Sequence, residues 1–392
     1  MEEKRLVPKR RFKDYLENWK LKKISDVGEI IGGGTPNTAI KEYWNGSINW
    51  FSPTEIGDKP YVFESQKKIT ELGLQYSSAK VLPAQKTVLF TSRAGIGDMA
   101  ILAKDAATNQ GFQSIVVKED SDVYFIYSMG FKIKEYALKN ASGSTFLEIS
   151  GKELSKAPVV VPEVKEQEKI GQFFKVLDKR IVNQEKKIAK VKALKEAYLT
   201  EMFPQEGETV PKRRFKGFKG EWNNDILGNI LDYEQPTNYI VESDQYNESY
   251  PTPVLTAGQS FILGYTNEKV GIKKANDNNP VIIFDDFTTG SHYVNFPFKV
   301  KSSALKILSA KIEKVLPYFS YLLLENLKYE PESHERHWIS IYSHFNILLP
   351  TIEEQEKICT FFKNIDNQIE AEEAKLEKLK QMKEAYLEEM FV

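Results

Sequence analysis

Two stretches of the chain carry apolar residues in alternating steps of about three and four, and the two stretches are near copies of each other. This spacing is typical of a helix that buries one narrow stripe against a partner. It predicts long helices over residues 162–203 and 350–391, each with a proline near its start. The expected stripes contain Phe174, Leu177, Ile181, Ile188 and Val191 in the first helix, and Phe362, Ile365, Ile369, Leu376 and Leu379 in the second.

Each expected helix is highly charged outside its stripe and needs a partner, which the other copy can supply. A two-fold relation between the copies makes that pairing antiparallel. Gln184 and Glu372 interrupt the two stripes at matching positions, so we expect them to fix the register at some cost in stability. The alternative is two separate amphipathic helices that each pack on their own domain.

Outside these helices the pattern changes to short β-branched and aromatic runs broken by Gly, Pro, Asn and Asp, over residues 22–155 and 223–345. Helical segments are expected at 123–140 and 315–327. We therefore predict an α+β fold, with two globular domains joined by two long antiparallel coiled-coil helices. The runs beginning at Val88 and Ile282 are interpreted as the same strand in both domains, followed by loops of different chemistry.

A basic segment that begins VPKRRFK also occurs twice, at residues 7–19 and 210–222. The spacer between the first helix and the second basic segment has nearly the length obtained by joining the C-terminus to the N-terminus. The repeat is thus pseudo-two-fold and circularly closed, and Met1 is expected near Val392. The expected parts are a basic segment 1–21, a domain 22–155, a helix 156–205, a basic segment 206–222, a domain 223–345 and a helix 346–392.

Composition narrows the class of protein without deciding it. The chain has 392 residues, a formal net charge of −1 and a single cysteine. Near-neutral charge argues against nonspecific binding of polyanions but leaves a local basic surface open. Cys359 excludes a disulfide framework and is expected to pack as a buried thiol. No secretory or membrane-spanning segment is recognised, so we expect a soluble cytoplasmic protein.

Polar loop residues in the two domains can address DNA. Arg binds guanine bidentately, Asn and Gln bind adenine, and hydroxyl groups bind bases or phosphates. Any one of them can equally be an ordinary solvated loop residue. The basic triplets at 9–11 and 212–214 can contact phosphate or pair with acidic helix residues. The candidates are Thr35, Ser92, Arg93, Asn109, Gln110 and Ser144 in the first domain, and Thr256, Thr288, Thr289, His292, Lys301 and Arg336 in the second.

No arrangement typical of catalysis is found in the sequence. The glycines at 32–34 lack the GxGxxG spacing of a dinucleotide loop. Asp285 and Asp286 are adjacent, and neighbouring residues of a strand point to opposite faces. His334, His337 and His344 are expected in a solvated or partner-contacting loop rather than at a metal. We expect no catalytic residue and no metal site.

The chain resembles the specificity subunit of type I restriction–modification systems. The resemblance rests on GEIIGGGTPNTAIKEYWNGSINWFSPTEI, TSRAGIGDMAI, NQGFQSIVV and, above all, the two helices that begin EQEKI and end KEAYLxEMF. It implies that each domain is a target recognition domain that reads one half of a split double-stranded DNA sequence. It also implies that the helix pair sets the spacing between the half-sites and docks two methyltransferase subunits.

The same resemblance implies that the chemistry lies in other chains. The methyltransferase subunits would bind S-adenosylmethionine, and two motor-nuclease subunits would use ATP and Mg. No catalytic residue is carried over to this chain. Two alternatives remain open: a specificity subunit of a related type II-like restriction system, and a coiled-coil scaffold without DNA binding.

Overall fold

The chain divides into two compact units, and each of the two long helices contributes residues to both units. A computed structural model describes residues 6–57, 59–93, 95–143, 147–256, 261–311, 313–327, 329 and 337–392. Unit 1 consists of Met1–Lys187 and Glu372–Val392, and unit 2 of Ile188–Ala371. The long helices are α6 (Val164–Met202) and α10 (Ile352–Met390).

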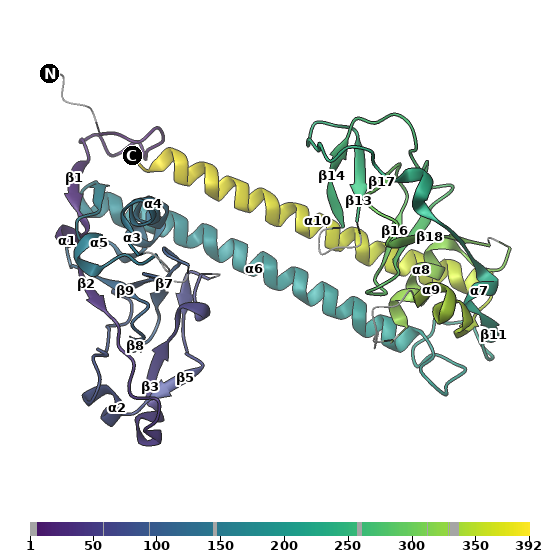
Figure 1. The fold of residues 1–392 in the computed structure, drawn as a ribbon, viewed down its shortest axis with the longest axis horizontal. Coiled ribbons are helices and arrows are strands. Elements are labelled where there is room, and N and C mark those ends of the chain that lie inside the picture. The colour runs from purple at the N-terminus through teal and green to yellow at the C-terminus, as the bar shows by residue number, and fades with distance from the viewer. Residues whose placement is uncertain are drawn as a thin grey trace. The chain divides into compact units, whose positions relative to one another are not determined.

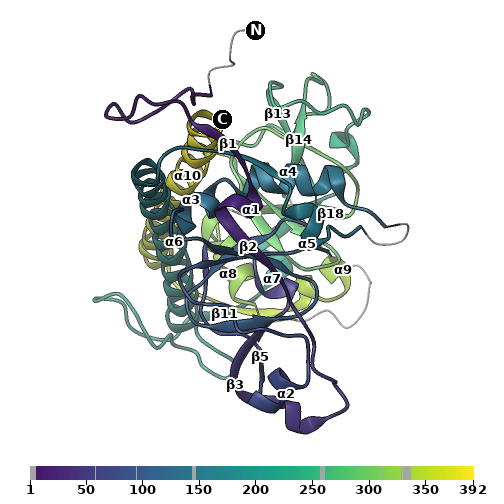
Figure 2. The same cartoon turned by 90° about the vertical axis from the view of Figure 1, so that its left-hand side faces the viewer.

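The domain of unit 1 is a mixture of strands and short helices, and its sheets are ordered β2-β9-β6-β7-β4, β5-β3-β8 and β1-β10. The sheet of β3 and β5 extends away from α6, toward the bottom of Figures 1 and 2. The elements are β1 (Lys20–Lys23), α1 (Ile24–Val27), β2 (Gly28–Gly32), η1 (Lys41–Tyr43), β3 (Trp44–Phe51), η2 (Pro53–Glu55), β4 (Tyr61–Val62), β5 (Lys67–Ile69), α2 (Glu71–Gln75), β6 (Thr87–Phe90), β7 (Met99–Leu102), β8 (Ala106–Thr108), β9 (Gln113–Val117), α3 (Val123–Ser128), α4 (Gly130–Asn140), α5 (Gly151–Leu154) and β10 (Pro158–Val161).

The domain of unit 2 repeats these strand connections with different loops, except that its described residues form no counterpart of β4. Its sheets are ordered β12-β18-β15-β16, β14-β13-β17 and β11-β19. The elements are β11 (Asn223–Ile226), α7 (Leu227–Ile230), β12 (Leu231–Glu234), η3 (Pro236–Tyr239), β13 (Thr252–Leu255), β14 (Ile262–Thr266), β15 (Val281–Asp285), β16 (Ser291–Val294), β17 (Lys299–Val300), β18 (Leu305–Ala310), α8 (Pro317–Asn326), α9 (His337–Ser340), η4 (Tyr342–His344) and β19 (Asn346–Leu349).

The strand register makes the two domains equivalent, position by position. Val88 of β6 lies opposite Ile115 of β9, and Ile282 of β15 lies opposite Leu308 of β18. The parallel pairs β3·β8 and β13·β17 flank these strands in the same way. The α+β class expected from the sequence is therefore confirmed, with β6 and β15 in the same place in the two sheets.

Each domain core closes on its long helix. Full burial of a large apolar side chain contributes roughly 1.5–3 kcal/mol, so these matched clusters supply much of the stability of each unit. The two clusters contain six residues at matching positions: Val88, Phe90, Ile115, Phe125, Phe174 and Phe391 in unit 1, and Ile282, Phe284, Leu308, Phe319, Phe362 and Phe203 in unit 2.

One helix boundary differs from the expectation. The segment expected as a single helix at 123–140 is broken at Met129, which lies between α3 and α4. Gly130 begins α4 directly over the sheet, where an added Cβ would lie 2.4 Å from the Met99 sulfur. This close approach needs a turn of the chain that periodicity alone does not reveal.

The start of each long helix is tied to its domain by one buried glutamine of the EQEKI motif. The Gln167 side chain donates to the Pro162 carbonyl (3.0 Å) and accepts from the N-cap residue of α3 (3.1 Å). Gln355 donates to the Pro350 carbonyl (3.1 Å) and accepts from the N-cap residue of α8 (2.9 Å). These bonds satisfy backbone groups that a helix start and a strand end would otherwise leave unpaired.

A tyrosine, an aspartate and a lysine join each domain to both long helices. The Tyr124 hydroxyl of α3 donates to Asp178 of α6 at 2.7 Å, and the Lys383 ammonium of α10 lies 2.7 Å from the same carboxylate. Burial and the carboxylate raise the pKa of Tyr124, so its hydroxyl stays a proton donor. The same three roles in unit 2 are taken by Tyr318, Asp366 and Lys195.

The basic triplets pair with acidic residues of the helices. Arg11 binds Glu166 through two bonds of 2.7 Å, and Arg214 binds Glu354 in the same bidentate way. Both glutamates are buried. Bidentate Arg–carboxylate pairs are among the stronger hydrogen bonds in proteins. Of the two interpretations open for these triplets, the ion pair holds for their second and third residues, with Arg10 on Glu389 and Arg213 on Glu201.

The end of α10 contacts the N-terminal basic segment. The end of α6 contacts the second basic segment in the same way. The Arg10 backbone NH donates to the Glu389 carbonyl at 2.8 Å, and the C-terminus lies beside β1 in Figures 1 and 2. Leu6 packs against the cluster that contains Phe391. The equivalent bond in unit 2 joins Arg213 to Glu201, also at 2.8 Å. Met1 lies outside the described residues, but Leu6 and Val392 both pack against the cluster that contains Phe391, which brings the described N-terminal residues and the C-terminus together.

The helices pair antiparallel within each unit, because rising numbers on α6 meet falling numbers on α10. In unit 1 the rings of Phe173 and Tyr386 are 5.0 Å apart, whereas Gln184 meets Glu372. Leu177 and Ile181 are buried, but Leu376 and Leu379 are only half-buried. In unit 1 the stripe is therefore buried on α6 and only half-buried at Leu376 and Leu379 of α10.

Gln184 and Glu372, the two interruptions of the stripes, contact each other. The Gln184 amide donates to the Glu372 carbonyl at 2.9 Å and to its carboxylate at 2.6 Å, and Lys187 pairs with the same carboxylate. A polar pair of this kind favours one register, because sliding either helix would leave both groups unpaired.

Candidate nucleic-acid interface

In the first domain, the candidate residues lie where several strands reach the same end of the two sheets. Strands β3 and β8 run parallel and end together at Phe51 and Thr108. Strand β6 ends beside the start of β9, where Thr91 forms a bridge to Phe112. The loops after β2, β3, β6 and β8 therefore converge, which places residues that are far apart in sequence on one edge.

Glycines allow the loop after β2 to lie against the loop after β8. An added Cβ at Gly33 would lie 1.8 Å from the Asn109 carbonyl oxygen, so no other residue fits without moving the backbone. The Gly34 NH donates to the Thr108 carbonyl at 2.8 Å. The glycine run thus serves close backbone packing that supports the loops.

Four candidates of the first domain meet on this edge with their polar groups near the surface. The Thr35 hydroxyl bonds to the Gln110 side chain, and the Asn109 side chain accepts from the Gly111 NH at 2.8 Å. Gln110 is exposed, and Arg93 is half-buried on the neighbouring loop. Within the described part of the chain, no hydrogen bond or ion pair involves Arg93, so its guanidinium can donate to a ligand.

Ser92 differs from the expectation, because its side chain is completely buried. Its backbone NH donates to the Gly111 carbonyl at 2.7 Å, and its carbonyl accepts from Ile149 at 3.0 Å. In this conformation the hydroxyl cannot contact DNA. The residue instead supports the base of the loop that carries Arg93.

The second domain builds its candidate loops on the equivalent strand ends. The Asp286 NH donates to the Ala304 carbonyl at 3.2 Å, and the Asp286 carbonyl accepts from the His337 NH at 3.1 Å. These two bonds match those of Ser92 with Gly111 and Ile149. The loop after β15 is therefore the counterpart of the loop after β6.

A buried ion pair holds the base of this loop. Asp286 and Lys306 are both buried, with 3.3 Å between carboxylate and ammonium. Asp286 also accepts from the Trp338 NH at 2.9 Å, and Lys306 donates to Gln235 at 3.0 Å. Asp286, for which the sequence argued against a metal role, thus supports the base of this loop.

The loop that follows is ordered by Asp285. Its carboxylate accepts from the Phe287 NH at 2.9 Å and from the Thr288 hydroxyl. The Thr289 hydroxyl donates to the Thr288 carbonyl at 2.6 Å, and Thr289 has a φ of 64°. Thr288 is exposed, so it remains accessible to a ligand.

Three further candidates of the second domain lie close to one another. The Thr256 NH donates to the Phe261 carbonyl at 3.0 Å, and the Phe261 ring stacks on His292 with 3.9 Å between centroids. Desolvation lowers the pKa of His292, which favours the neutral imidazole. The Lys301 NH donates to the last residue of β13 at 2.8 Å, while its ammonium pairs with Asp244.

Sequence reasoning missed Phe287, which is 37% exposed on the loop after β15. The matched bonds of Ser92 and Asp286 place Phe287 at the position of Arg93. The residue was overlooked because only polar side chains were sought. Aligning the two strands from Val88 and Ile282 would have revealed it. Ser144, Arg336 and His334 lie outside the described residues.

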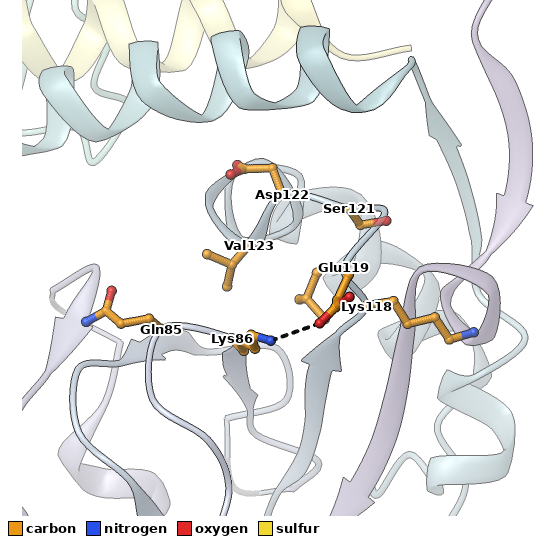
Figure 3. Close-up of a pocket in the computed structure, with 8 residues that line it drawn as sticks. Gln85, Lys86, Lys118, Glu119, Ser121, Asp122 and Val123 are labelled. Atoms are coloured by element: carbon orange, nitrogen blue, oxygen red, sulfur yellow. Dashed lines mark ion pairs between the residues drawn. The ribbon is translucent and has the colours of Figure 1, made fainter.

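A surface pocket of about 320 Å³ lies at the opposite end of the first sheet, beside the start of α3. Figure 3 shows the Lys86 side chain directed toward Glu119, with 3.5 Å between their charged atoms. Both side chains are well exposed, so the pair is weak. The pocket is lined mostly by charged and polar side chains, as a solvated surface is.

The described residues contain no group of three or more His, Cys, Asp or Glu side chains placed to hold a metal ion. No helix among them is long and apolar enough to cross a bilayer.

Two α+β domains of one topology, carried on a duplicated helix framework and ending in different loops, define a modular recognition protein with one candidate binding edge in each domain. The fold is that of known specificity subunits. A type I restriction–modification S subunit from M. genitalium matches with a TM-score of 0.65 and 15% identity over 98% of this chain and 99% of that chain. A chain from a study of complex assembly and conformational transition in a type I system matches with a TM-score of 0.53 and 16% identity, over 95% and 97% of the two chains.

The chain belongs to the type I restriction modification DNA specificity domain family, whose profile matches residues 16–193 and 219–381. The MjaIX specificity subunit of Methanocaldococcus jannaschii is 30% identical over 79% of this chain and 77% of its own length. The EcoR124I/EcoR124II specificity subunit of Escherichia coli is 47% identical over 36% of this chain and 35% of its own. The chain is accordingly a DNA sequence-recognition subunit of the type I restriction–modification class.

Proposed function

We propose that this chain reads a bipartite double-stranded DNA sequence, with one half-site bound by each domain. The observation that carries the proposal is the pair of equivalent strand-end loops. Their supporting backbone bonds are the same, and their exposed chemistry differs. Two scaffolds that match and two loop sets that do not are what a reader of two unlike half-sites requires.

The first domain supplies hydrogen-bonding groups for its half-site. The guanidinium of Arg93 suits the O6 and N7 atoms of guanine, and the amides of Asn109 and Gln110 suit adenine. The second domain offers the hydroxyl of Thr256, together with the hydroxyl oxygens of Thr288 and Thr289, which already donate within the loop and can accept from a base. Lys301 can bind phosphate when its ammonium exchanges Asp244 for the DNA. The expected result is direct readout from both edges together with phosphate contacts that fix position.

The helix pair sets the gap between the half-sites and docks two methyltransferase subunits, and two motor-nuclease subunits join this assembly. The antiparallel pairing, the Gln184–Glu372 contact and the likeness to a chain from a study of complex assembly in a type I system support this part of the proposal. A fixed register is what a constant spacing needs, because one turn of helix corresponds to about 5.4 Å.

The chain itself carries no catalysis in this proposal. Methyl transfer from S-adenosylmethionine takes place in the methyltransferase subunits, and ATP with Mg is used by the motor-nuclease subunits. The purified chain should therefore show no methyltransferase, ATPase or nuclease activity, and methylation should appear when the methyltransferase partner is added. Methyl transfer by the chain alone would contradict the proposal.

Exchange of domains tests the readout. Residues 223–345 are replaced by the same part of a relative, and the methylated sites are mapped with the partner subunits present. One half-site should change, and the other half-site and the gap should stay. A matched exchange of residues 22–155 should change the other half-site. Lengthening both long helices by the same number of turns should change only the gap. An exchange that alters both half-sites would contradict the proposal that each domain recognises its half-site independently.

A further inference from the structure

We propose that Phe287 is a specificity-determining residue of the second domain and that it contacts the 5-methyl group of a thymine in the major groove. The inference rests on the proposed function, because it assumes that the second domain reads a half-site. It adds an apolar residue to the polar candidates of the second domain and names the group on the DNA that this residue contacts.

The position of Phe287 in the fold is that of Arg93. Arg93 follows Val88, and Phe287 follows the equivalent Ile282, by the same number of positions. Both also come directly after a residue whose NH and carbonyl make the same two backbone bonds. In the first domain that residue is Ser92, and in the second it is Asp286. The two loops therefore present different side chains from one site of the scaffold.

Hydrogen bonds of the loop hold the backbone at Phe287 in place. The Phe287 NH donates to the Asp285 carboxylate at 2.9 Å, and Thr288 bonds to the same carboxylate. Directly beneath, Asp286 is anchored by Lys306 and by the Trp338 NH. A side chain placed on a loop braced in this way loses little conformational freedom when it binds, which favours a specific contact.

The chemistry of Phe287 points to an apolar feature of the DNA. Its ring offers no hydrogen-bond donor, and it is 37% exposed, outside every hydrophobic core cluster found among the described residues. In the major groove, the feature that suits such a ring is the thymine methyl group. His292, on the strand β16 that leaves the same loop, stacks on Phe261, which precedes β14, and the Phe261 ring adds apolar surface there. Where Arg93 suits guanine, the equivalent position of the second domain thus suits thymine.

The test uses the chain in complex with its methyltransferase partner and DNA carrying the mapped site. Each thymine of the second half-site is replaced in turn by deoxyuridine, which removes only the methyl group. At one position the affinity of the wild-type complex should fall about fourfold, the loss expected for one buried methyl group. With Phe287→Ala, the thymine and deoxyuridine duplexes should bind equally. Phe287→Leu should keep part of the difference.

Val270→Ser, a change at an 83% exposed apolar residue of the same domain, is the matched control and should leave the difference intact. The inference fails if the second half-site contains no thymine, or if deoxyuridine binds as well as thymine at every position. It also fails if the difference between thymine and deoxyuridine persists in Phe287→Ala, or if the only defect of this variant is that it no longer binds the methyltransferase subunit. If 2-aminopurine fluorescence shows that a neighbouring base is unstacked, Phe287 inserts between bases as a wedge, and the proposed contact with a methyl group is wrong. Specific binding of the first half-site by Phe287→Ala is measured as well. It should be retained if only the inference about Phe287 fails, whereas neither half-site is bound specifically if the proposed function itself is wrong.

Discussion

The two domains agree most closely where they meet the long helices and least where their strands end. At the helices, Gln167 and Gln355 make the same pair of bonds, and Arg11 and Arg214 bind matching glutamates. At the strand ends, the scaffold repeats while the side chain changes from Arg93 to Phe287. Contacts that join the parts are thus held constant, and the surface available for recognition is varied.

This difference separates two kinds of residue that look alike in sequence. Arg11 and Arg93 are both arginines near loops. Arg11 forms an ion pair with a buried carboxylate, whereas Arg93 forms no ion pair with any described residue. A cation that already pairs inside the fold cannot release counterions from DNA without breaking that pair. A guanidinium on a strand-end loop without a partner among the described residues, rather than basic charge in general, therefore marks Arg93 as a candidate DNA contact.

The largest effect is expected from charges placed in the helix stripe. Leu177 and Ile181 are 4% and 8% exposed, Ile365 is 9% exposed and Ile369 is half-buried. Replacing Leu177 and Ile181 together with Asp should lower the free energy of unfolding by roughly 1.5–3 kcal/mol for each residue, with a further loss for the buried charges.

The matched change at Ile365 and Ile369 should cost less, because Ile369 retains contact with solvent. Urea unfolding of both double variants, followed by partner binding, measures the difference. Equal stability of either variant and the wild type would show that the substituted pair is not part of a closed stripe.

The next largest effect is expected from breaking the arginine–glutamate pairs. Arg11→Met leaves the buried carboxylate of Glu166 unpaired and should destabilise the protein by about 3–5 kcal/mol. Arg214→Met should cost a similar amount through Glu354, because the geometry is the same. Chemical denaturation measures both changes. The double variant Arg11→Met with Glu166→Met should recover much of the loss, and no recovery would show that packing rather than charge governs the site.

Loss of one base contact should be smaller and confined to one half-site. Arg93→Ala should relax the specificity at one base pair of the first half-site at a cost of about 1–3 kcal/mol. Mapping of methylated sites and binding at several salt concentrations measure it. Uniform weakening of all sequences with a flatter salt dependence would assign Arg93 to a phosphate. Lys301→Ala, at a residue already paired with Asp244, provides the comparison in the second domain.

The smallest effect is a pH dependence at the polar contact between the helices. The hydrogen bond from Gln184 and the pairing with Lys187 lower the pKa of Glu372. Because the unfolded value is about 4.3, the stabilisation is complete above that pH and is lost as the pH falls through the lower, folded value.

Glu372→Gln should therefore flatten the decrease in stability on acidification below about pH 4.3, with only a slight change at neutral pH. Urea midpoints measured across this range test it. Glu370→Gln, at an exposed carboxylate of the same helix, is the control and should keep the wild-type profile. An unchanged profile for Glu372→Gln would remove this contact from the account.

The sequence alone determined the elements whose signal is local or repeated. The steps of three and four along 162–203 and 350–391 predicted the helices, and duplication predicted that they pair and that the chain closes on itself. The strands beginning at Val88 and Ile282 were matched from their apolar runs. These features need no knowledge of distant contacts, because periodicity and repetition are written along the chain.

The tertiary structure decided how each polar side chain is used. It paired Arg11 with Glu166, 155 residues away. It buried Ser92 and paired Lys306 with Asp286 inside the fold. It also placed Phe287 at the site of Arg93. Whether a polar group is satisfied or exposed depends on which strands and loops surround it. A sequence therefore gives the candidates, and packing determines which of them remain free to bind.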